Sequence, residues 1–238
     1  MPPRAPFGLA GFRRGLRVGL AMALPILVYG LAFGIVAAQA GMGAGMAMAY
    51  SATVFSGSAQ LAAVSVMQSG QATLWAIAAT VLVMNARYLL FGATLQPWLS
   101  QAGTGRSLIS LLFLGDANWI ATMKVIDAGE EDRAYLLGTG VPLLVVWLAG
   151  TLAGAVFGAI LPDPKALGAD LMLPAFAASM MAVMVKAPAS LVPVAIGAGA
   201  ALAMGAWAGA GWGIVAAGIA GGGFAAATAK DTGKGTGK

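Results

Sequence analysis

Two side chains of opposite charge stand inside stretches of the chain that are otherwise apolar. Arg87 lies late in the apolar run 72–95, and Asp116 lies near the middle of the run 107–126. An arginine within a membrane helix costs at least about 2.5 kcal/mol on insertion scales, so it is expected either to find a partner or to reach the outer interface. Asp116 is the predicted counter-ion. Two interpretations stay open: a static ion pair, and a carboxylate that also binds a proton during transport.

The segment 50–60 concentrates hydroxyl and amide side chains around a glycine. Glycine weakens a helix, and backbone groups freed at membrane depth are tolerated only where protein or a watery cavity meets them. The pattern favours a broken or locally unwound helix that lines a polar path. The alternative is that the hydroxyls only bond neighbouring helices to one another. With the charged pair and two asparagines, the predicted translocation site comprises Ser51, Phe55, Ser56, Gly57, Ser58, Gln60, Asn85, Arg87, Asp116 and Asn118.

The composition indicates that these residues belong to a membrane protein. Of the 238 residues, 60% are hydrophobic and 9% are charged, whereas an average soluble domain carries about 25% charged residues. The sequence has no Cys and no His, which excludes disulfides, the usual zinc sites and histidine-dependent catalysis, and we expect no cofactor. The net charge of +5 comes from basic residues at the edges of apolar runs, so nucleic-acid binding is not expected.

The hydrophobic pattern predicts an all-α, polytopic bundle of about eight transmembrane helices. A spanning helix needs about 20 apolar residues. The first run, although it follows a basic start, is too long for a signal peptide and is expected to be retained. Seven spans are the alternative, because the sixth and seventh runs are short. The candidate spans are 17–40, 46–68, 72–95, 107–126, 135–161, 171–186, 189–205 and 207–227.

Basic residues in the connecting loops predict that both termini are cytoplasmic. We expect a cytoplasmic segment at 1–16, a membrane domain at 17–228 and a disordered cytoplasmic tail at 229–238. The acidic loop 127–133 is interpreted as a solvated turn. In this orientation only Arg106 and Lys165 fall outside. The cytoplasmic basic residues are Arg4, Arg13, Arg14, Arg17, Arg133, Lys186, Lys230, Lys234 and Lys238.

Two further patterns concern packing. Pro25 and Pro142 stand in similar surroundings, and Phe55 and Phe176 follow them at similar offsets, which suggests a weak internal repeat. Glycines four residues apart predict closely packed helices, within the chain or against a second subunit. These glycines include Gly30 and Gly34, and Gly150, Gly154 and Gly158.

The same residues resemble the AzlC family, the large subunit of bacterial branched-chain amino acid exporters. The resemblance covers about residues 10–225, and Asp116 falls where the family has an acidic residue. Ala86, Tyr88 and Trp119 depart from the family's pattern. The residues that carry the resemblance are Phe12 to Gly15, Pro25, Phe33, Gly34, Ala40, Gly41, Ser51, Val54 to Gln60, and Asn85 to Leu90.

The resemblance implies a multi-pass protein of the bacterial inner membrane that exports branched-chain amino acids with a small AzlD-type membrane subunit. Arg87 is then expected to meet the substrate carboxylate, and Asp116 its ammonium or a proton, with Phe33 or Phe55 beside the apolar side chain. An ion gradient would drive export, since no nucleotide-binding motif is present.

Two alternatives to this function remain. The chain is either a non-transporting scaffold subunit, which would tolerate Ser58→Ala and Gln60→Leu, or an intramembrane hydrolase using Ser56 or Ser58. The hydrolase needs Lys124 or Lys186 as its base, because the sequence lacks histidine.

Overall fold

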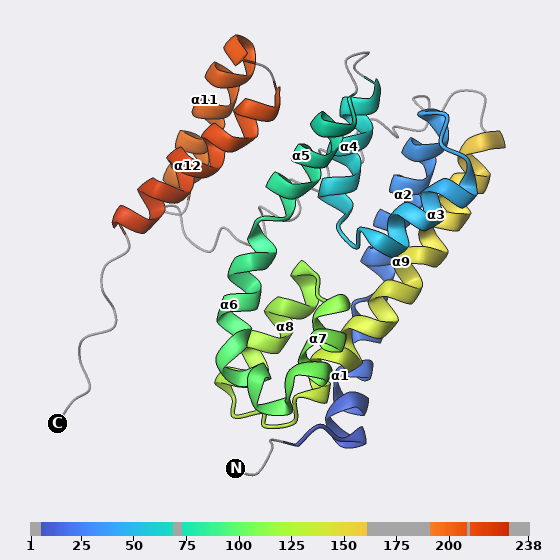
Figure 1. Ribbon diagram of the computed structural model, residues 1–238, viewed down its shortest axis with the longest axis vertical. Helices are drawn as coiled ribbons and strands as arrows, with labels where there is room; N and C mark the ends of the chain where they lie inside the picture. The colour runs from blue at the N-terminus through green and yellow to red at the C-terminus, as the bar shows by residue number, and fades with distance from the viewer. Residues whose placement is uncertain (1–5, 69–72, 161–190, 209, 229–238) are drawn as a thin grey trace. The chain divides into compact units, whose positions relative to one another are not determined.

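A computed structural model describes residues 6–68, 73–160, 191–208 and 210–228, and every regular element among them is a helix (Figure 1). The chain divides into two compact units, Met1–Pro174 and Ala175–Lys238, which are described separately. The all-α prediction is confirmed for the described residues. The sixth candidate span (171–186), Lys165, Phe176, Lys186 and the tail 229–238 lie outside them.

The first unit contains two helices that are long and apolar enough to cross a membrane, and one bent pair of helices that makes a third only if the pair forms a single span. Helices α5 and α6 continue into a short 3-10 turn, so that Leu74–Ala102 forms one of the two, and α9 forms the other; α1 and α2, bent by 59° about Met22, are the bent pair. These correspond to the predicted first, third and fifth spans. The elements are α1 (Leu9–Ala21), α2 (Ala23–Gln39), α3 (Ala44–Thr53), α4 (Gly57–Gln68), α5 (Leu74–Asn85), α6 (Arg87–Leu99), η1 (Ser100–Ala102), α7 (Thr104–Leu112), α8 (Asp116–Asp127) and α9 (Ala134–Ile160).

Helices α1 and α2 run parallel to α9, and glycines bring the backbones together. A Cβ on Gly15 would lie 2.2 Å from the Tyr135 carbonyl oxygen, and one on Gly34 would lie 2.2 Å from that of Thr151. Such distances leave room only for hydrogen, which is why larger side chains are absent at these positions. The prediction of close packing at these glycines is confirmed, and the partner is a helix of the same chain.

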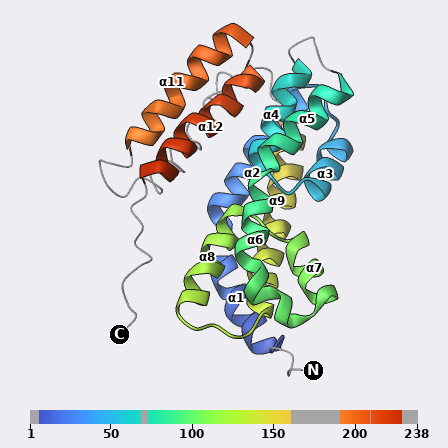
Figure 2. The same ribbon diagram turned by 60° about the vertical axis from the view of Figure 1, so that its left-hand side comes forward.

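The predicted second span is a hairpin that turns back halfway. Helix α3 starts from a turn that lines one surface cavity with the last residues of α9, and by Ser51 it has reached Thr151, with the two hydroxyl oxygens 2.9 Å apart. The helix breaks at residues 54–56. Helix α4 then returns beside α5, antiparallel to it, and ends close to where α5 begins (Figures 1 and 2). The broken helix predicted here is confirmed, and neither α3 nor α4 alone is long enough to cross a membrane.

The predicted fourth span is a second hairpin, and it enters from the opposite end. At its start the Arg106 guanidinium lies 5.3 Å from the centre of the Phe7 ring, so this turn is next to the N-terminal residues. Helix α7 ends at Leu112, the chain turns at residues 113–115, and α8 returns to the same end, where a loop leads into α9 (Figure 2).

Two predictions are therefore corrected. Arg106 lies at the same end as the N-terminal segment, not across the membrane from it, and Asp116 begins a helix and does not lie in the middle of one. Two of the eight candidate spans, 46–68 and 107–126, are each divided between two short helices that form a hairpin, so neither contains one continuous helix long enough to cross a membrane. A half-length arm and half of a spanning helix have the same apolar composition, so hydropathy alone does not separate them.

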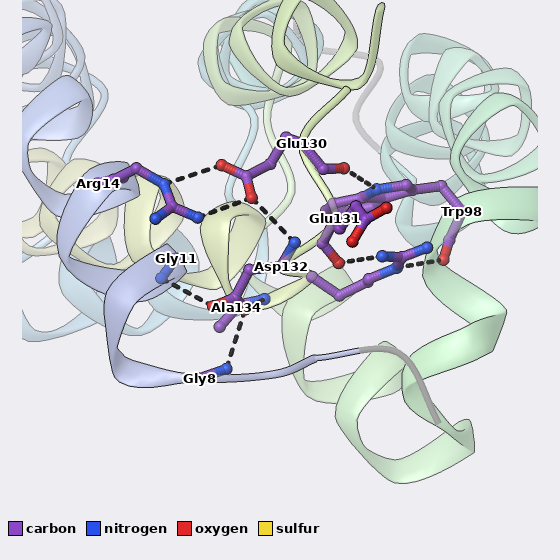
Figure 3. Close-up of polar contacts among 9 residues, drawn as sticks. Gly8, Gly11, Arg14, Trp98, Glu130, Glu131, Asp132 and Ala134 are labelled. Carbon is purple, nitrogen blue, oxygen red and sulfur yellow. Dashed lines mark hydrogen bonds and ion pairs between the residues drawn. The ribbon is translucent and has the colours of Figure 1, made fainter. Parts of the chain in front are cut away.

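The acidic loop before α9 is solvated only in part, because residues 127–129 and Glu131 are exposed whereas Asp132 and Arg133 are buried in a polar cluster (Figure 3). Asp132 is 7% exposed, and its carboxylate accepts hydrogen bonds from the backbone N–H groups of Gly8 (2.9 Å), Gly11 (2.8 Å) and Ala134 (3.1 Å). One side chain thus satisfies free N–H groups at the start of both α1 and α9. Burial raises the pKa of Asp132, but these hydrogen bonds and the charge of Arg14 outweigh it, and the pKa lies below its ordinary value.

Two arginines complete this cluster, which we call the loop cluster (residues Gly8, Gly11, Arg14, Trp98, Gln101 and Glu130 to Ala134). Arg14 forms a two-pronged ion pair with Glu130, at 2.7 and 2.9 Å. Arg133, 6% exposed, donates to the carbonyls of Trp98 and Glu131 and to the Gln101 side chain. Burial raises the pKa of Glu130, but the Arg14 ion pair and the Asp132 N–H overcome it and leave that pKa lowered.

The second unit is a pair of antiparallel helices, α11 (Leu191–Ala208) and α12 (Ala210–Thr228). Gly197 packs against Ala217 and Gly221, while Gly213 packs against Ala201 and Gly205. The two helices coincide with the apolar runs predicted at 189–205 and 207–227.

Candidate functional site

Three helix breaks of the first unit come together at one place. They are the two hairpin tips, at residues 54–56 and 113–115, and the joint at Ala86 between α5 and α6. Each hairpin tip is followed by the first turn of a helix, whose N–H groups have no partners within the helix and carry partial positive charge, whereas at Ala86 the backbone stays helical and α6 continues α5. Arg87 begins α6 and Asp116 begins α8, so the sequence places both charged residues directly at breaks.

The predicted ion pair is confirmed. Arg87 Nη2 lies 3.0 Å from Asp116 Oδ2, and the same nitrogen donates to the hydroxyls of Ser58 at 2.9 Å and Ser56 at 3.3 Å. The side chains of Arg87 and Asp116 remain 33% and 30% exposed. Arg87 Nε and the Asn85 side-chain oxygen are buried with no hydrogen-bond partner in the described part of the chain. The pair therefore leaves hydrogen-bonding capacity unused.

Aromatic residues join the two hairpin tips. The Tyr88 hydroxyl donates to the Phe55 carbonyl at 3.3 Å, and a Cβ on Gly115 would lie 3.6 Å from the Phe55 ring, an ordinary contact. The Arg87 guanidinium lies 5.4 Å from the centre of the Tyr88 ring. Phe55, one of the residues predicted for the site, thus lies beside Tyr88 and the second tip. Tyr88 was not among the predicted site residues, and its position next to Arg87 was the available signal.

Gly57 lets the first tip approach an aromatic pair from α2 and α9. A Cβ on Gly57 would lie 2.5 Å from the Tyr29 ring and 2.8 Å from that of Trp147. Tyr29 and Trp147 meet edge to face, with ring centroids 5.3 Å apart, and Phe33 stacks behind Trp147. The sequence predicted that Phe33 or Phe55 lies beside the substrate side chain. Phe33 is fully buried, so it supports this aromatic pair and does not line an open site.

Ser51 and Gln60 form a separate, fully buried network inside the first hairpin. The Gln60 amide lies 3.0 Å from the Ser51 hydroxyl, which in turn pairs with Thr151. With the amide nitrogen turned toward the break, Gln60 donates to the Val54 carbonyl at 3.1 Å while its oxygen accepts from Ser51. We assign this orientation because it satisfies both ends of the amide. These two predicted site residues hold the broken backbone and do not contact Arg87.

In the second hairpin, Asn118 likewise holds the broken backbone through hydrogen bonds. Its side-chain nitrogen donates to the Phe113 carbonyl at 2.7 Å, and its oxygen accepts from the Gly115 N–H at 2.7 Å. Asn118 is fully buried, so it closes the tip from inside. The predicted residues that remain around the ion pair are Phe55, Ser56, Gly57, Ser58, Asn85, Arg87 and Asp116.

Comparison with known proteins shows which family the chain belongs to. The model of the family described as AzlC protein matches residues 21–161, more than half of the chain and the whole stretch from α2 to α9. The chain belongs to the AzlC family. The inner membrane protein YgaZ of Escherichia coli (strain K12) is 27% identical over 187 residues, which cover 76% of this chain and 75% of that protein. No solved structure matches.

The resemblance to the AzlC family expected from the sequence is thereby confirmed. Both hairpins, the Ala86 joint and the Arg87–Asp116 pair lie inside the matched residues, so the candidate site belongs to the part of the chain that the family shares. Membership supports a membrane protein with a transport-related role. Among the described residues of this AzlC-family chain, no group of three or more acidic, His or Cys side chains is placed to hold a metal ion.

Proposed function

We propose that this chain is the large subunit of an exporter for branched-chain or other small apolar amino acids in a bacterial inner membrane. A small AzlD-type membrane subunit is its partner, and an ion gradient drives export. The observation that carries the proposal is the Arg87–Asp116 pair. The two side chains are 33% and 30% exposed, Arg87 Nε has no hydrogen-bond partner among the described residues, and the pair lies where three helix breaks meet. Intramembrane charges at broken helices mark substrate or ion paths in transporters.

The chemistry of an amino acid matches this pair. A zwitterionic amino acid brings one carboxylate and one ammonium. Its carboxylate can bind Arg87 in place of Asp116, and its ammonium can bind Asp116 in place of Arg87, so the net charge of the site does not change. The substrate carboxylate takes the place of Asp116 on Arg87, where the Ser56 and Ser58 hydroxyls already point at the same nitrogen. The free Asp116 carboxylate then accepts the ammonium, and Phe55 and Tyr88 offer apolar surface to the substrate side chain.

Efflux of preloaded, labelled valine tests this function. Cells without endogenous exporters express the chain with and without an AzlD-type subunit, as wild type, Arg87→Ala or Arg106→Ala. We expect wild type to accelerate efflux and Arg87→Ala to reduce the gain at least about tenfold, since a charge-assisted carboxylate contact is worth roughly 1.5–3 kcal/mol. Arg106→Ala is the matched control, because that arginine lies against Phe7, away from the site.

Two results would contradict the proposal. One is full efflux by an Arg87→Ala variant of normal membrane abundance. The other is no efflux of valine, leucine, isoleucine or methionine by a well-expressed complex. A scaffold subunit would give the second result.

Gradient coupling has its own test, because it rests on Asp116. Once the substrate separates it from Arg87, this carboxylate is free to take up a proton. We expect Asp116→Asn to remove the response of export to an imposed pH gradient. An Asp116→Asn variant that still exports and responds fully would exclude proton coupling through this residue.

A further inference from the structure

The two hairpins are built in the same way. Each begins after a glycine, Gly43 or Gly103, with a first arm of 10 or 9 residues, and each ends in a second arm of 12 residues. In each, a fully buried carboxamide side chain of the second arm donates a hydrogen bond to the backbone carbonyl of the first residue of the tip. That carboxamide is Gln60, bonded to Val54, in the first hairpin and Asn118, bonded to Phe113, in the second.

The hairpins nevertheless enter the unit from opposite ends. The Gly43 turn lines a surface cavity with Ala155, Val156, Ala159 and Ile160, at the C-terminal end of α9. The turn before α7 lies at the other end, where Arg106 contacts Phe7 and Ser107 donates to the Leu99 carbonyl. Structural repeats of inverted direction that meet at broken helices are the usual architecture of transporters in which a central site faces the two sides alternately.

The tips divide the site between them. The first tip supplies the hydroxyls of Ser56 and Ser58, the second supplies Asp116, and Arg87, on the α5–α6 joint, bonds to both. The Arg87–Asp116 pair and the contact between Gly115 and the Phe55 ring hold the tips together. Separating either tip from Arg87 would expose the site toward the end from which that hairpin enters.

We infer that the Arg87–Asp116 site opens alternately to the two ends of the first unit, the α3–α4 hairpin closing it toward the Gly43 end and the α7–α8 hairpin toward the Gly105 end. This inference rests on the proposed transport function, but it concerns access to the site and not the identity of the substrate. It assigns a separate gate to each side of the membrane.

Thiol labelling from each side tests the inference, and the natural absence of cysteine gives a clean background. Ser58→Cys places a thiol at the site. Gly43→Cys and Gly105→Cys are the matched controls, since both glycines are exposed and a Cβ at either has no atom within 4 Å. A membrane-impermeant maleimide is added to right-side-out and to inside-out vesicles that contain the full chain with its partner subunit.

We expect each control to be labelled in only one vesicle orientation, opposite for the two, and the Ser58→Cys thiol to be labelled in both. Labelling of that thiol from one face only, or from neither face in a protein of normal abundance, would overturn the inference. Valine is added in a separate arm. If valine binds at the site, it should slow labelling of the Ser58→Cys thiol. Labelling that valine does not slow would count against the proposed substrate, whereas labelling from both faces without valine tests access alone.

A cross-link distinguishes alternating gates from a permanently open channel. The hydroxyl oxygens of Ser51 and Thr151 are 2.9 Å apart, so Ser51→Cys with Thr151→Cys is positioned for a disulfide that ties α3 to α9. In this background, oxidation is expected to slow labelling of the Ser58→Cys thiol from the Gly43 face at least about tenfold, because it removes one of two states.

Labelling from the Gly105 face should continue, and reduction of the disulfide should restore both rates. Equal labelling from both faces after oxidation would refute the gate assigned to the α3–α4 hairpin. Membrane abundance and a melting temperature equal to those of wild type after reduction check that the triple variant is folded.

Discussion

The first unit contains two clusters in which arginines pair with carboxylates, and the clusters differ in how many of their hydrogen-bonding groups have partners. In the loop cluster, Asp132 accepts three backbone hydrogen bonds, Glu130 receives two prongs of Arg14, and Arg133 reaches three acceptors. In the membrane pair, Arg87 and Asp116 share one contact, and Arg87 Nε remains without a partner in the described residues. A cluster with every group satisfied stabilises one structure, whereas one with unused capacity is suited to exchanging partners.

The difference predicts that Asp132 matters most for folding. Asp132→Ala leaves the N–H groups of Gly8, Gly11 and Ala134 without their acceptor. Helix caps contribute about 1 kcal/mol each, and buried donors left unpaired cost more, so we expect a loss of about 3 kcal/mol of unfolding free energy. Thermal denaturation of the purified protein measures this. A melting temperature equal to that of wild type would mean that water replaces the carboxylate and that the loop cluster is not a structural lock.

Acid should weaken the loop cluster next. The folded pKa values of Glu130 and Asp132 lie below their ordinary values of 4.5 and 3.8, so the unfolded chain binds protons first as pH falls. Their stabilising contribution is complete above the ordinary values and is lost as pH falls through them toward the folded values. We expect the melting temperature to fall below about pH 4.5. Glu130→Gln with Asp132→Asn should flatten that fall, and an unchanged slope would place the acid sensitivity elsewhere.

The membrane pair should give the smallest effect on stability and a large one on transport. Replacing both members of an ion pair by neutral groups is often nearly neutral for folding, whereas removing one leaves a charge alone. For Arg87→Gln with Asp116→Asn we expect unfolding free energy within about 1 kcal/mol of wild type, together with loss of efflux. A double variant as unstable as Asp132→Ala would show that both clusters stabilise the fold and do not differ in role.

Local sequence patterns predicted the chemistry of the site better than the path of the chain. Arg87 and Asp116 are costly in an apolar run, so each demanded a partner, and the glycine and hydroxyls at 56–58 indicated the first break. Whether a broken segment crosses or returns depends on contacts between distant residues. Arg106 against Phe7 is such a contact, and no local pattern contains it.

Partners distant in sequence also determine how the predicted polar residues are placed. Ser51 and Gln60 were predicted as path residues, and the local pattern could not show that Ser51 pairs with Thr151, which lies 100 positions away. The loop 127–133 looked solvated for the same reason. The groups that bury Asp132 are backbone N–H groups of Gly8 and Gly11, and backbone donors leave no trace in residue type.

The carboxylate of Asp132 also sets an order for biosynthesis. It caps backbone groups 124 and 121 positions earlier in the chain, at Gly8 and Gly11. At roughly 5–20 residues per second, the ribosome adds that stretch in about 6–25 s. During that interval the start of α1 is already made but has no acceptor for its free N–H groups. Helix α1 therefore gains this acceptor only when residue 132 has been synthesised, and a chain that stops earlier leaves the N–H groups of Gly8 and Gly11 without it.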